Sequence, residues 1–240
     1  MQVNFLLFPA LTQLDLTGPY EVLARVPGFH IDFVSASMEP VRSDRGLVML
    51  PTATFDTARP CDLLVVPGGP GTDDVLNDRQ WVEFTARQAA TARYILGICT
   101  GSLLLGAAGL LRGKRASCHW QAREFLPLFG AVREDVRMCV DGNLFTSGGV
   151  TSGIDMALKA VALMRDVDTA RQIQLQRARC RVRAMLRSDR AERHQAGQGG
   201  GEAKHGLVHG SGHSWRMAAG GRRQAAGARR DGRSARGELA

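Results

Sequence analysis

Residues 94–109 read Tyr-Ile-Leu-Gly-Ile-Cys-Thr-Gly-Ser-Leu-Leu-Leu-Gly-Ala-Ala-Gly, and this stretch decides the fold. Its first five residues are an apolar run that predicts a buried strand, and the leucines and small residues after Gly101 predict a tightly packed helix. Gly97 and Gly101 flank Cys99 and Thr100 in the connection between the two. So abrupt a turn from strand to helix should hold Cys99 in a strained, exposed backbone position.

The position of Cys99 suits a nucleophile. Amide N–H groups at the start of a helix favour negative charge, so a thiol there should have a lowered pKa, and the thiolate is the reactive form. The alternative is that Cys99 is one more small buried apolar residue, as most free cysteines are. Taken alone, the stretch supports both interpretations equally, and the rest of the chain is needed to separate them.

Strand patterns alternate with helical patterns along residues 1–176, which predicts an α/β sandwich of the doubly wound type. Apolar runs without polar alternation indicate strands buried on both faces, hence a mostly parallel sheet with helices on each side. Besides 94–98, the predicted strands are 3–8, 31–36, a weak edge strand at 45–51, 62–66, 116–120, and a hairpin of 136–140 with 144–147. The predicted helices are one starting near residue 19, then 80–92, 102–111, 121–128, 154–165 and 167–176.

A short loop containing Asp15 follows the first predicted strand. Pro19 is expected in the first turn of the next helix, with Thr17 or Gly18 as its cap. Asp15 would then lie at the carboxyl end of a strand, where open α/β sheets bind their ligands. The alternative is an aspartate that only caps the turn, as loop aspartates usually do.

A glycine-rich loop, residues 67–71, follows another near-continuous apolar strand. It lacks the GxGxxG and GK[ST] patterns of phosphate-binding loops. Gly68 and Gly69 could instead present backbone N–H groups to a developing negative charge, although a simple tight turn explains the sequence nearly as well. Right-handed crossovers would bring Asp15, this loop and Cys99 to one rim of the sheet, as covalent catalysis with proton transfer requires.

Other candidates for chemistry are weaker. His119 could act as a base, but a histidine beside a tryptophan is more often structural. Five cysteines without a CxxC pair indicate reduced thiols in the cytoplasm, and neither a disulfide framework nor a metal site is expected. No apolar stretch is long enough to span a bilayer, and the N-terminus does not have the pattern of a signal peptide.

The charge is distributed unevenly along the chain. Residues 1–176 hold 16 Lys and Arg against 18 Asp and Glu, whereas residues 177–240 hold 15 against 5. The first part therefore lacks the excess positive charge that favours binding to nucleic acid. The second part is rich in Gly, Arg and Ala, which predicts a disordered basic tail. The chain is therefore expected to be one globular domain, 1–176, followed by that tail, 177–240.

Several motifs occur together in order: Asp15-Leu-Thr-Gly-Pro-Tyr-Glu-Val-Leu, Pro67-Gly-Gly, Ile98-Cys-Thr-Gly-Ser, His119-Trp and Gly148-Gly-Val-Thr-Ser-Gly-Ile-Asp. In these residues the chain resembles the DJ-1/PfpI family of the class I glutamine amidotransferase-like superfamily. The resemblance covers roughly residues 2–176. It implies a flavodoxin-like three-layer sandwich, a cysteine nucleophile at an elbow, a homodimer, and no metal or organic cofactor.

Within the family the similarity is greatest to the isonitrile hydratases, which are carbon–oxygen lyases. This resemblance implies an isonitrile as substrate, with Cys99 as nucleophile, Asp15 as catalytic acid and base, and Thr100 helping to hold the site. In PfpI itself a histidine follows the cysteine directly. Thr100 occupies that place here, which argues against a protease-like function.

Two other functions remain open. The same domain resembles the N-terminal part of AraC-type transcription regulators, but the remaining residues lack the helical periodicity of a DNA-binding reader. A DJ-1-like stress protein with an oxidant-sensing cysteine is the other alternative. The abrupt change to Arg177-Ala-Arg-Cys-Arg departs from the family pattern and is typical of a frameshift.

Overall fold

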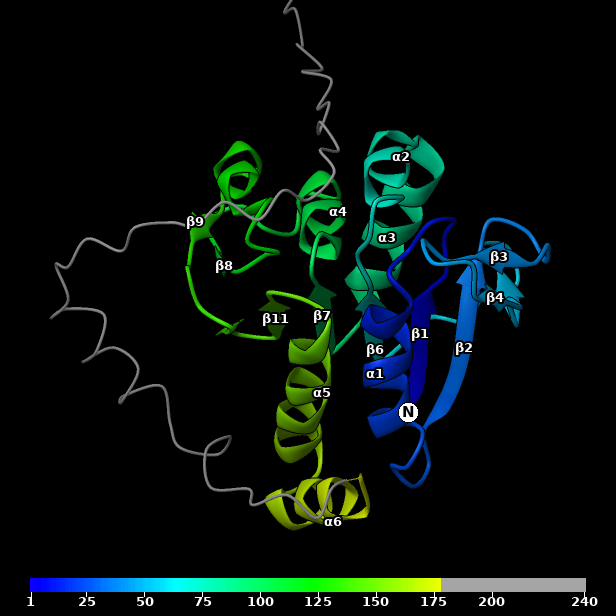
Figure 1. The fold of residues 1–240 in the computed structure, drawn as a ribbon, viewed down its shortest axis with the longest axis vertical. Helices are drawn as coiled ribbons and strands as arrows, with labels where there is room; N and C mark the ends of the chain where they lie inside the picture. The colour runs from blue at the N-terminus through cyan, green and yellow to red at the C-terminus, as the bar shows by residue number, and fades with distance from the viewer. Residues whose placement is uncertain (178–240) are drawn as a thin grey trace, which may run out of the picture.

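The computed structural model describes residues 1–177, and the tail expected at 177–240 lies outside the described residues except for its first residue. One seven-stranded sheet with the order β10-β11-β7-β6-β1-β2-β5 forms the centre (Figure 1). All neighbouring strands are parallel except β10 and β11, which pair antiparallel. The strands are β1 (Gln2–Leu6), β2 (His30–Ser35), β5 (Ala53–Thr54), β6 (Leu63–Val66), β7 (Tyr94–Ile98), β10 (Met138–Asp141) and β11 (Leu144–Ser147). The predicted α/β sandwich with a mostly parallel sheet is therefore confirmed.

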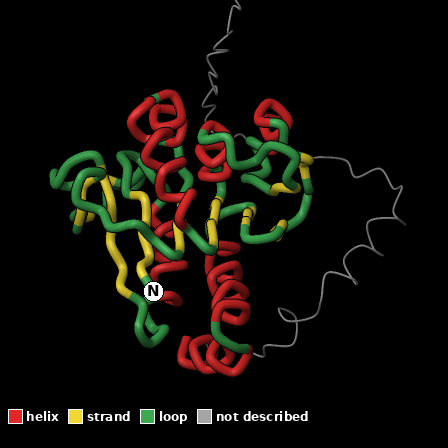
Figure 2. The backbone as a smooth tube through the Cα atoms, turned by 180° about the vertical axis from the view of Figure 1, so that it is seen from behind, coloured by secondary structure: helices red, strands yellow, loops and turns green. Residues whose placement is uncertain are grey.

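Helices cover both faces of the sheet. On one face α1 (Gln13–Leu23) and α5 (Thr151–Met164) pack against each other, and α6 (Val167–Arg177) packs on α5 (Figures 1 and 2). On the other, α2 (Thr72–Asn77), α3 (Arg79–Thr91) and α4 (Gly101–Ala107) pack together. Right-handed crossovers explain the two layers, because the chain moves from β1 to β2 in one direction and from β6 to β7 in the other.

The core lies between these layers. All four residues of β6 are buried, as are four of the five residues of β7, which explains why both strands lack polar alternation. Between β1 and β6 the strand order reverses, and the carboxyl ends of such neighbours leave a crevice where ligands bind in open α/β sheets. The candidate site occupies this rim. Among residues 1–177, no helix combines the length and the apolar composition needed to cross a bilayer.

The start of α1 was predicted wrongly. The helix begins at Gln13 after Thr12, so Asp15 lies in its first turn rather than in a loop, and Pro19 lies inside it. Pro19 removes the backbone hydrogen bond to the Asp15 carbonyl and its ring crowds that carbonyl, which is a cost to the helix. Gly18 has no side chain, so Ile154 of α5 approaches α1 closely. This packing of α1 on α5 compensates for the proline in the helix.

The strand predicted at 45–51 forms only at Val48–Met49, and its predicted place at the edge of the main sheet is wrong. The chain turns back at Gly46, whose φ is +90°, and forms a small separate hairpin of β3 (Val41–Arg42) and β4 (Val48–Met49). The edge of the main sheet is instead β5, which pairs with the end of β2. Apolar residues at 47, 48 and 50 resemble a strand in sequence but are largely exposed here.

Two further elements are shorter than expected. The helix predicted at 102–111 ends at Ala107, and Gly109 with a φ of +81° terminates it. The strand predicted at 116–120 is reduced to β8 (Arg115–Ala116), which pairs with β9 (Val132–Arg133), and a 3₁₀ helix (Arg123–Phe129) stands where 121–128 was expected to be helical. The hairpin of β10 and β11 and the helices α3, α5 and α6 are confirmed within a few residues.

Candidate active site

Cys99 lies at the elbow between β7 and α4. Its φ is +57°, in the left-handed region that residues with a side chain rarely adopt, so the predicted strain is confirmed. Its N–H donates to the Ser147 carbonyl (3.0 Å), and its own carbonyl accepts from the Cys118 thiol (3.1 Å). The side chain is buried rather than exposed as predicted, because the glycine-rich segments around it pack closely.

The carboxylate of Asp15 lies beside the thiol of Cys99. One carboxylate oxygen, Oδ1, accepts from the Val150 N–H (2.6 Å), and Oδ2 accepts from the Gly68 N–H (3.2 Å). The Cys99 thiol interacts with the same carboxylate closely enough for each group to change the pKa of the other. Asp15 is fully buried, so its role is not that of a surface turn cap. The convergence predicted for Asp15, the 67–71 loop and Cys99 is confirmed in its geometry.

Thr100 joins the elbow to the glycine-rich loop. Its Oγ1 accepts from the Gly69 N–H (2.9 Å) and shares a hydrogen bond with the Thr72 hydroxyl (2.8 Å). Gly68 and Gly69 were predicted to offer N–H groups to a substrate, but both groups are occupied by side chains of the site. We therefore assign these two N–H groups to holding Asp15 and Thr100 in place.

Burial changes the acidity of Asp15. It raises the pKa of this carboxyl from 3.8 to about 6, against the opposing effect of hydrogen bonds from Val150 N–H, the Cys99 thiol and Gly68 N–H. The negative charge of Asp44 acts in the same direction as burial. A carboxyl with a pKa near 6 can both take up and release a proton near neutral pH.

The acidity predicted for Cys99 is wrong. Burial, and then the negative charge of Asp15, raise the pKa of this thiol well above its ordinary value. The Thr100 N–H acts in the opposite direction but does not outweigh them. The site therefore holds a neutral thiol beside a carboxylate, and a thiolate would form here only with a proton acceptor close by.

His119 does not take part in the contacts of this pair. The hydrogen bonds described at Asp15 and Cys99 involve other residues, and the His119 ring lies near that of Trp120 with centroids 5.8 Å apart. Burial, and then the charge of Arg123, lower the pKa of His119. In the part of the chain that the structure describes, no group of three or more His, Cys, Asp or Glu side chains could hold a metal ion.

Comparison with known proteins shows the family to which this chain belongs. The sequence model of the DJ-1/PfpI family matches residues 1–163. The chain belongs to the DJ-1/PfpI family. An isonitrile hydratase of Pseudomonas putida is 49% identical over 176 residues, which are 73% of this chain and 77% of that protein.

Two further proteins are similar to this chain. A crystal structure of a THiJ/PfpI family protein from Pseudomonas syringae is 42% identical and has a TM-score of 0.72, over 73% of this chain and 74% of that one. The HTH-type transcriptional regulator CdhR of Pseudomonas aeruginosa is 30% identical over 75% of this chain but only 55% of its own length. This chain therefore matches about half of that regulator.

Three contacts of the site were not predicted from sequence. They are the Val150 N–H on Asp15, the Cys118 thiol on the Cys99 carbonyl, and the Thr72 hydroxyl on Thr100. Gly148-Gly149 was visible as the start of a helix, yet nothing local indicated that it faces the cysteine. Such contacts join segments up to 135 residues apart, and only the assembled sheet brings them together.

Gly149 gives a direct test of how tightly Cys99 is enclosed. Its φ is +94°, and an added Cβ would overlap the Cβ of Cys99 and lie 2.8 Å from its Sγ. We expect Gly149→Ala to displace the thiol from Asp15 and to slow alkylation of Cys99 by iodoacetamide at least about tenfold. Peptide mass spectrometry of Cys99 over time measures that rate.

Gly109→Ala is the matched control for Gly149→Ala. Gly109 also has a positive φ, +81°, but a Cβ there would meet nothing within 4 Å. Both variants strain the backbone by about 1 kcal/mol, so only the clash with Cys99 differs between them. Equal alkylation rates in the two variants would show that Gly149 does not confine the thiol.

Proposed function

We propose that this chain is an isonitrile hydratase, which adds water to R–N≡C to give the formamide R–NH–CHO. The observation that carries the proposal is the buried pair of the Cys99 thiol, on its strained elbow, and the Asp15 carboxylate, held by the Gly68 and Val150 N–H groups. Membership of the DJ-1/PfpI family and the 49% identity to an isonitrile hydratase of Pseudomonas putida support it.

The first half of the reaction forms a covalent intermediate. The terminal carbon of an isonitrile is electron-rich and accepts a proton as a nucleophile adds to it. Asp15 takes the proton of the Cys99 thiol and delivers it to this carbon while the sulfur–carbon bond forms. The product is a thioimidate, R–N=CH–S–Cys99, and Asp15 is again a carboxylate. One proton has moved from sulfur to carbon, and no group has left.

The second half consumes water. Asp15 accepts a proton from a water molecule, whose oxygen attacks the thioimidate carbon, and the proton passes to nitrogen. The tetrahedral adduct, R–NH–CH(OH)–S–Cys99, then collapses by breaking its carbon–sulfur bond. The hydroxyl proton returns to the departing sulfur by way of Asp15. Substrate and water supply every atom of the formamide, and the balance requires no electron donor or acceptor.

The acidities in the site favour this sequence. A neutral thiol brings into the site the proton that the isonitrile carbon requires, and the carboxylate beside it can carry that proton. The Thr100 N–H lowers the pKa of the Cys99 thiol and would stabilise the thiolate as it forms. The site thus needs proton transfer over short distances rather than a free thiolate at rest.

We further infer that the chain works as a homodimer, as the family resemblance implies, and in the cytoplasm, as its cysteines without a CxxC pair indicate. A regulator-like or oxidant-sensing function would use the same domain without turnover. CdhR gives the regulator alternative limited support, because this chain matches only 55% of the length of CdhR. A mobility-shift titration of promoter DNA at several salt concentrations addresses it, since the basic tail alone could bind DNA weakly.

Incubation of the purified protein with an aromatic isonitrile tests the proposed function. We expect the corresponding formamide to accumulate linearly with time and protein concentration, as measured by chromatography with mass detection. Heat-denatured protein is the control for uncatalysed hydration. A folded protein that yields no formamide above this control, with aromatic and alkyl isonitriles alike, would contradict the proposal.

A further inference from the structure

The carbonyl of Cys99 is set apart from the helix that follows it. In the first turn of α4, the Leu103 N–H donates to the Thr100 carbonyl rather than to that of Cys99. The Cys99 carbonyl instead accepts from the thiol of Cys118 (3.1 Å). A thiol is a weak donor, so this carbonyl has a weaker partner than the backbone N–H that a helix would supply. The strained elbow therefore rests partly on a side chain from another segment.

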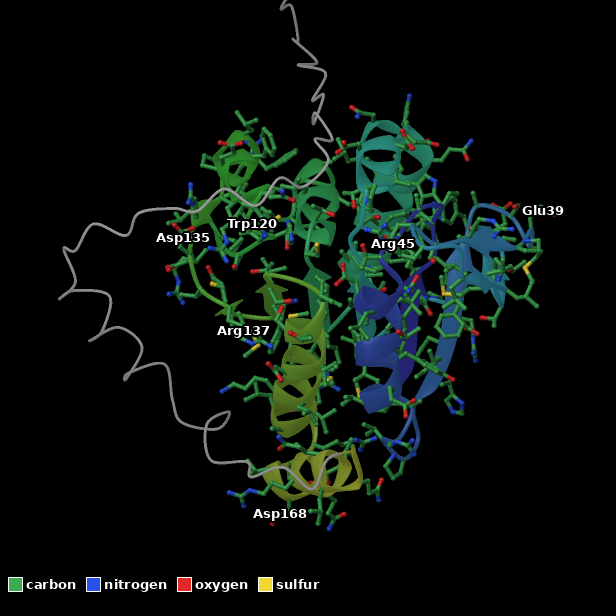
Figure 3. The ribbon with its side chains drawn as sticks, in the orientation of Figure 1. Glu39, Arg45, Trp120, Asp135, Arg137 and Asp168 are labelled. Carbon is green, nitrogen blue, oxygen red and sulfur yellow. The ribbon has the colours of Figure 1, made fainter. Side chains whose placement is uncertain are left out.

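Cys118 is itself held firmly. The Cys118 carbonyl accepts a hydrogen bond from the Arg123 Nε (3.0 Å). Arg123 in turn forms an ion pair with Asp135 (3.7 Å), which Figure 3 shows on the same side of the molecule as Trp120. The neighbouring Ser117 N–H donates to the Thr146 hydroxyl (2.8 Å), which ties the segment to β11. The thiol is fully buried and reaches the elbow from this fixed backbone.

The chemistry of Cys118 suits a permanent donor. Burial raises the pKa of its thiol to about 12, so the proton stays on sulfur throughout the working pH range. The hydrogen bond that its thiol donates goes to the carbonyl of Cys99. Cys118 is therefore placed to act on the reacting pair through the Cys99 peptide.

We propose that Cys118 is a positioning residue: its S–H···O hydrogen bond fixes the peptide of Cys99, and so aims the Cys99 sulfur at Asp15. The N–H of Cys99 is held by the Ser147 carbonyl, and its carbonyl is held by Cys118. With both ends of the residue fixed, the left-handed φ of +57° is maintained. The effect on turnover rests on the proposed hydratase function, whereas the effect on Cys99 reactivity does not.

Three variants test this role: Cys118→Ala removes the donor, Cys118→Ser restores a hydroxyl donor, and Cys61→Ala is the matched control. Cys61 is also a buried thiol directed at a backbone carbonyl, that of Gln88 at 3.9 Å, but it lies away from the site. For each variant, kcat and KM are measured with an aromatic isonitrile. The alkylation rate of Cys99 by iodoacetamide is measured separately by peptide mass spectrometry.

We expect Cys118→Ala to lower kcat about tenfold, equivalent to about 1.4 kcal/mol, with KM changed less than twofold. Alkylation of Cys99 should slow by a similar factor, because a misdirected thiol loses its proton acceptor. Cys118→Ser should keep at least about a third of both rates, and Cys61→Ala should keep them unchanged.

Two results would overturn the inference. One is Cys118→Ala behaving like Cys61→Ala in both rates. The other is Cys118→Ser falling as far as Cys118→Ala, which would assign the effect to packing rather than to the hydrogen bond. If wild-type protein turns over no isonitrile but alkylation of Cys99 follows the expected order, the hydratase function fails and the positioning role of Cys118 stands.

Discussion

Replacing Cys99 with alanine should reduce isonitrile hydration by at least about a thousandfold, to the level of the uncatalysed reaction. Without the sulfur no thioimidate can form, and no other described side chain contacts Asp15 as a nucleophile. Cys99→Ser should be almost as inactive, because a hydroxyl gives up its proton far less readily than a thiol. Initial rates of formamide production measure both losses.

The intermediate offers a second measurement on the same variants. Because no group leaves in the first half of the reaction, wild-type protein quenched during turnover should gain the full mass of the isonitrile. Peptide mapping should place that mass on Cys99. Cys99→Ala should show no such gain at the same substrate concentration.

Cys61→Ala is the control for the loss of a buried thiol in general. Burial raises the pKa of Cys61 to about 12, so this thiol is unreactive and should not affect turnover. Cys99→Ala should also fold, since alanine fits the space and the backbone hydrogen bond to Ser147 remains. Formamide production by folded Cys99→Ala within tenfold of wild type would refute covalent catalysis by this residue.

The elbow itself could be predicted because its signals are local. The run at 94–98 matches β7 residue for residue, and the glycines around Cys99 indicated an abrupt turn. Periodicity and turn residues report on neighbours along the chain, so the order of strands and helices followed from them. The start of α1 was missed because Pro19 is a strong helix-start signal, and packing of Gly18 on Ile154 overrides it.

The acidity of the site could not be predicted in the same way. A cysteine before a helix suggests a stabilised thiolate, but the sign of its pKa shift depends on burial and on Asp15, 84 positions away in sequence. The same holds for Gly68 and Gly69, whose N–H groups looked free for a substrate until their side-chain partners were located. Long-range contacts set the chemistry, and a sequence pattern shows only which residues are available for them.

Replacing Asp15 with asparagine should lower kcat/KM at least about a hundredfold, because among residues 1–177 Asp15 is the carboxylate beside the Cys99 thiol that can carry its proton to carbon. The amide is nearly the same size and can still accept one of the two backbone hydrogen bonds from Val150 and Gly68. In the wild type, kcat/KM should rise with pH through about 6, where Asp15 becomes a carboxylate able to accept the thiol proton. Wild-type rates in Asp15→Asn would remove Asp15 from proton transfer.

The same substitution should change how stability depends on pH. The pKa of Asp15 is about 6 in the folded protein and near 3.8 when unfolded, so between these values the folded state binds more protons. The stabilisation from protonated Asp15 is fully present below pH 3.8 and is lost as the pH rises through 6. The difference in pKa corresponds to about 3 kcal/mol. Asp15→Asn has no proton to lose and should not show this decline.

Urea unfolding of both proteins at several pH values between 4 and 7 measures the effect. The unfolding free energy of wild type minus that of Asp15→Asn should fall by about 2.4 kcal/mol across this range, whatever the other carboxylates contribute to both. Asp168→Asn, on an exposed side chain of α6, corrects for the loss of a carboxylate in general (Figure 3). A difference that stays constant or grows with pH would mean that Asp15 is not destabilised by burial, and the carboxyl would then be too acidic to return its proton to carbon at neutral pH.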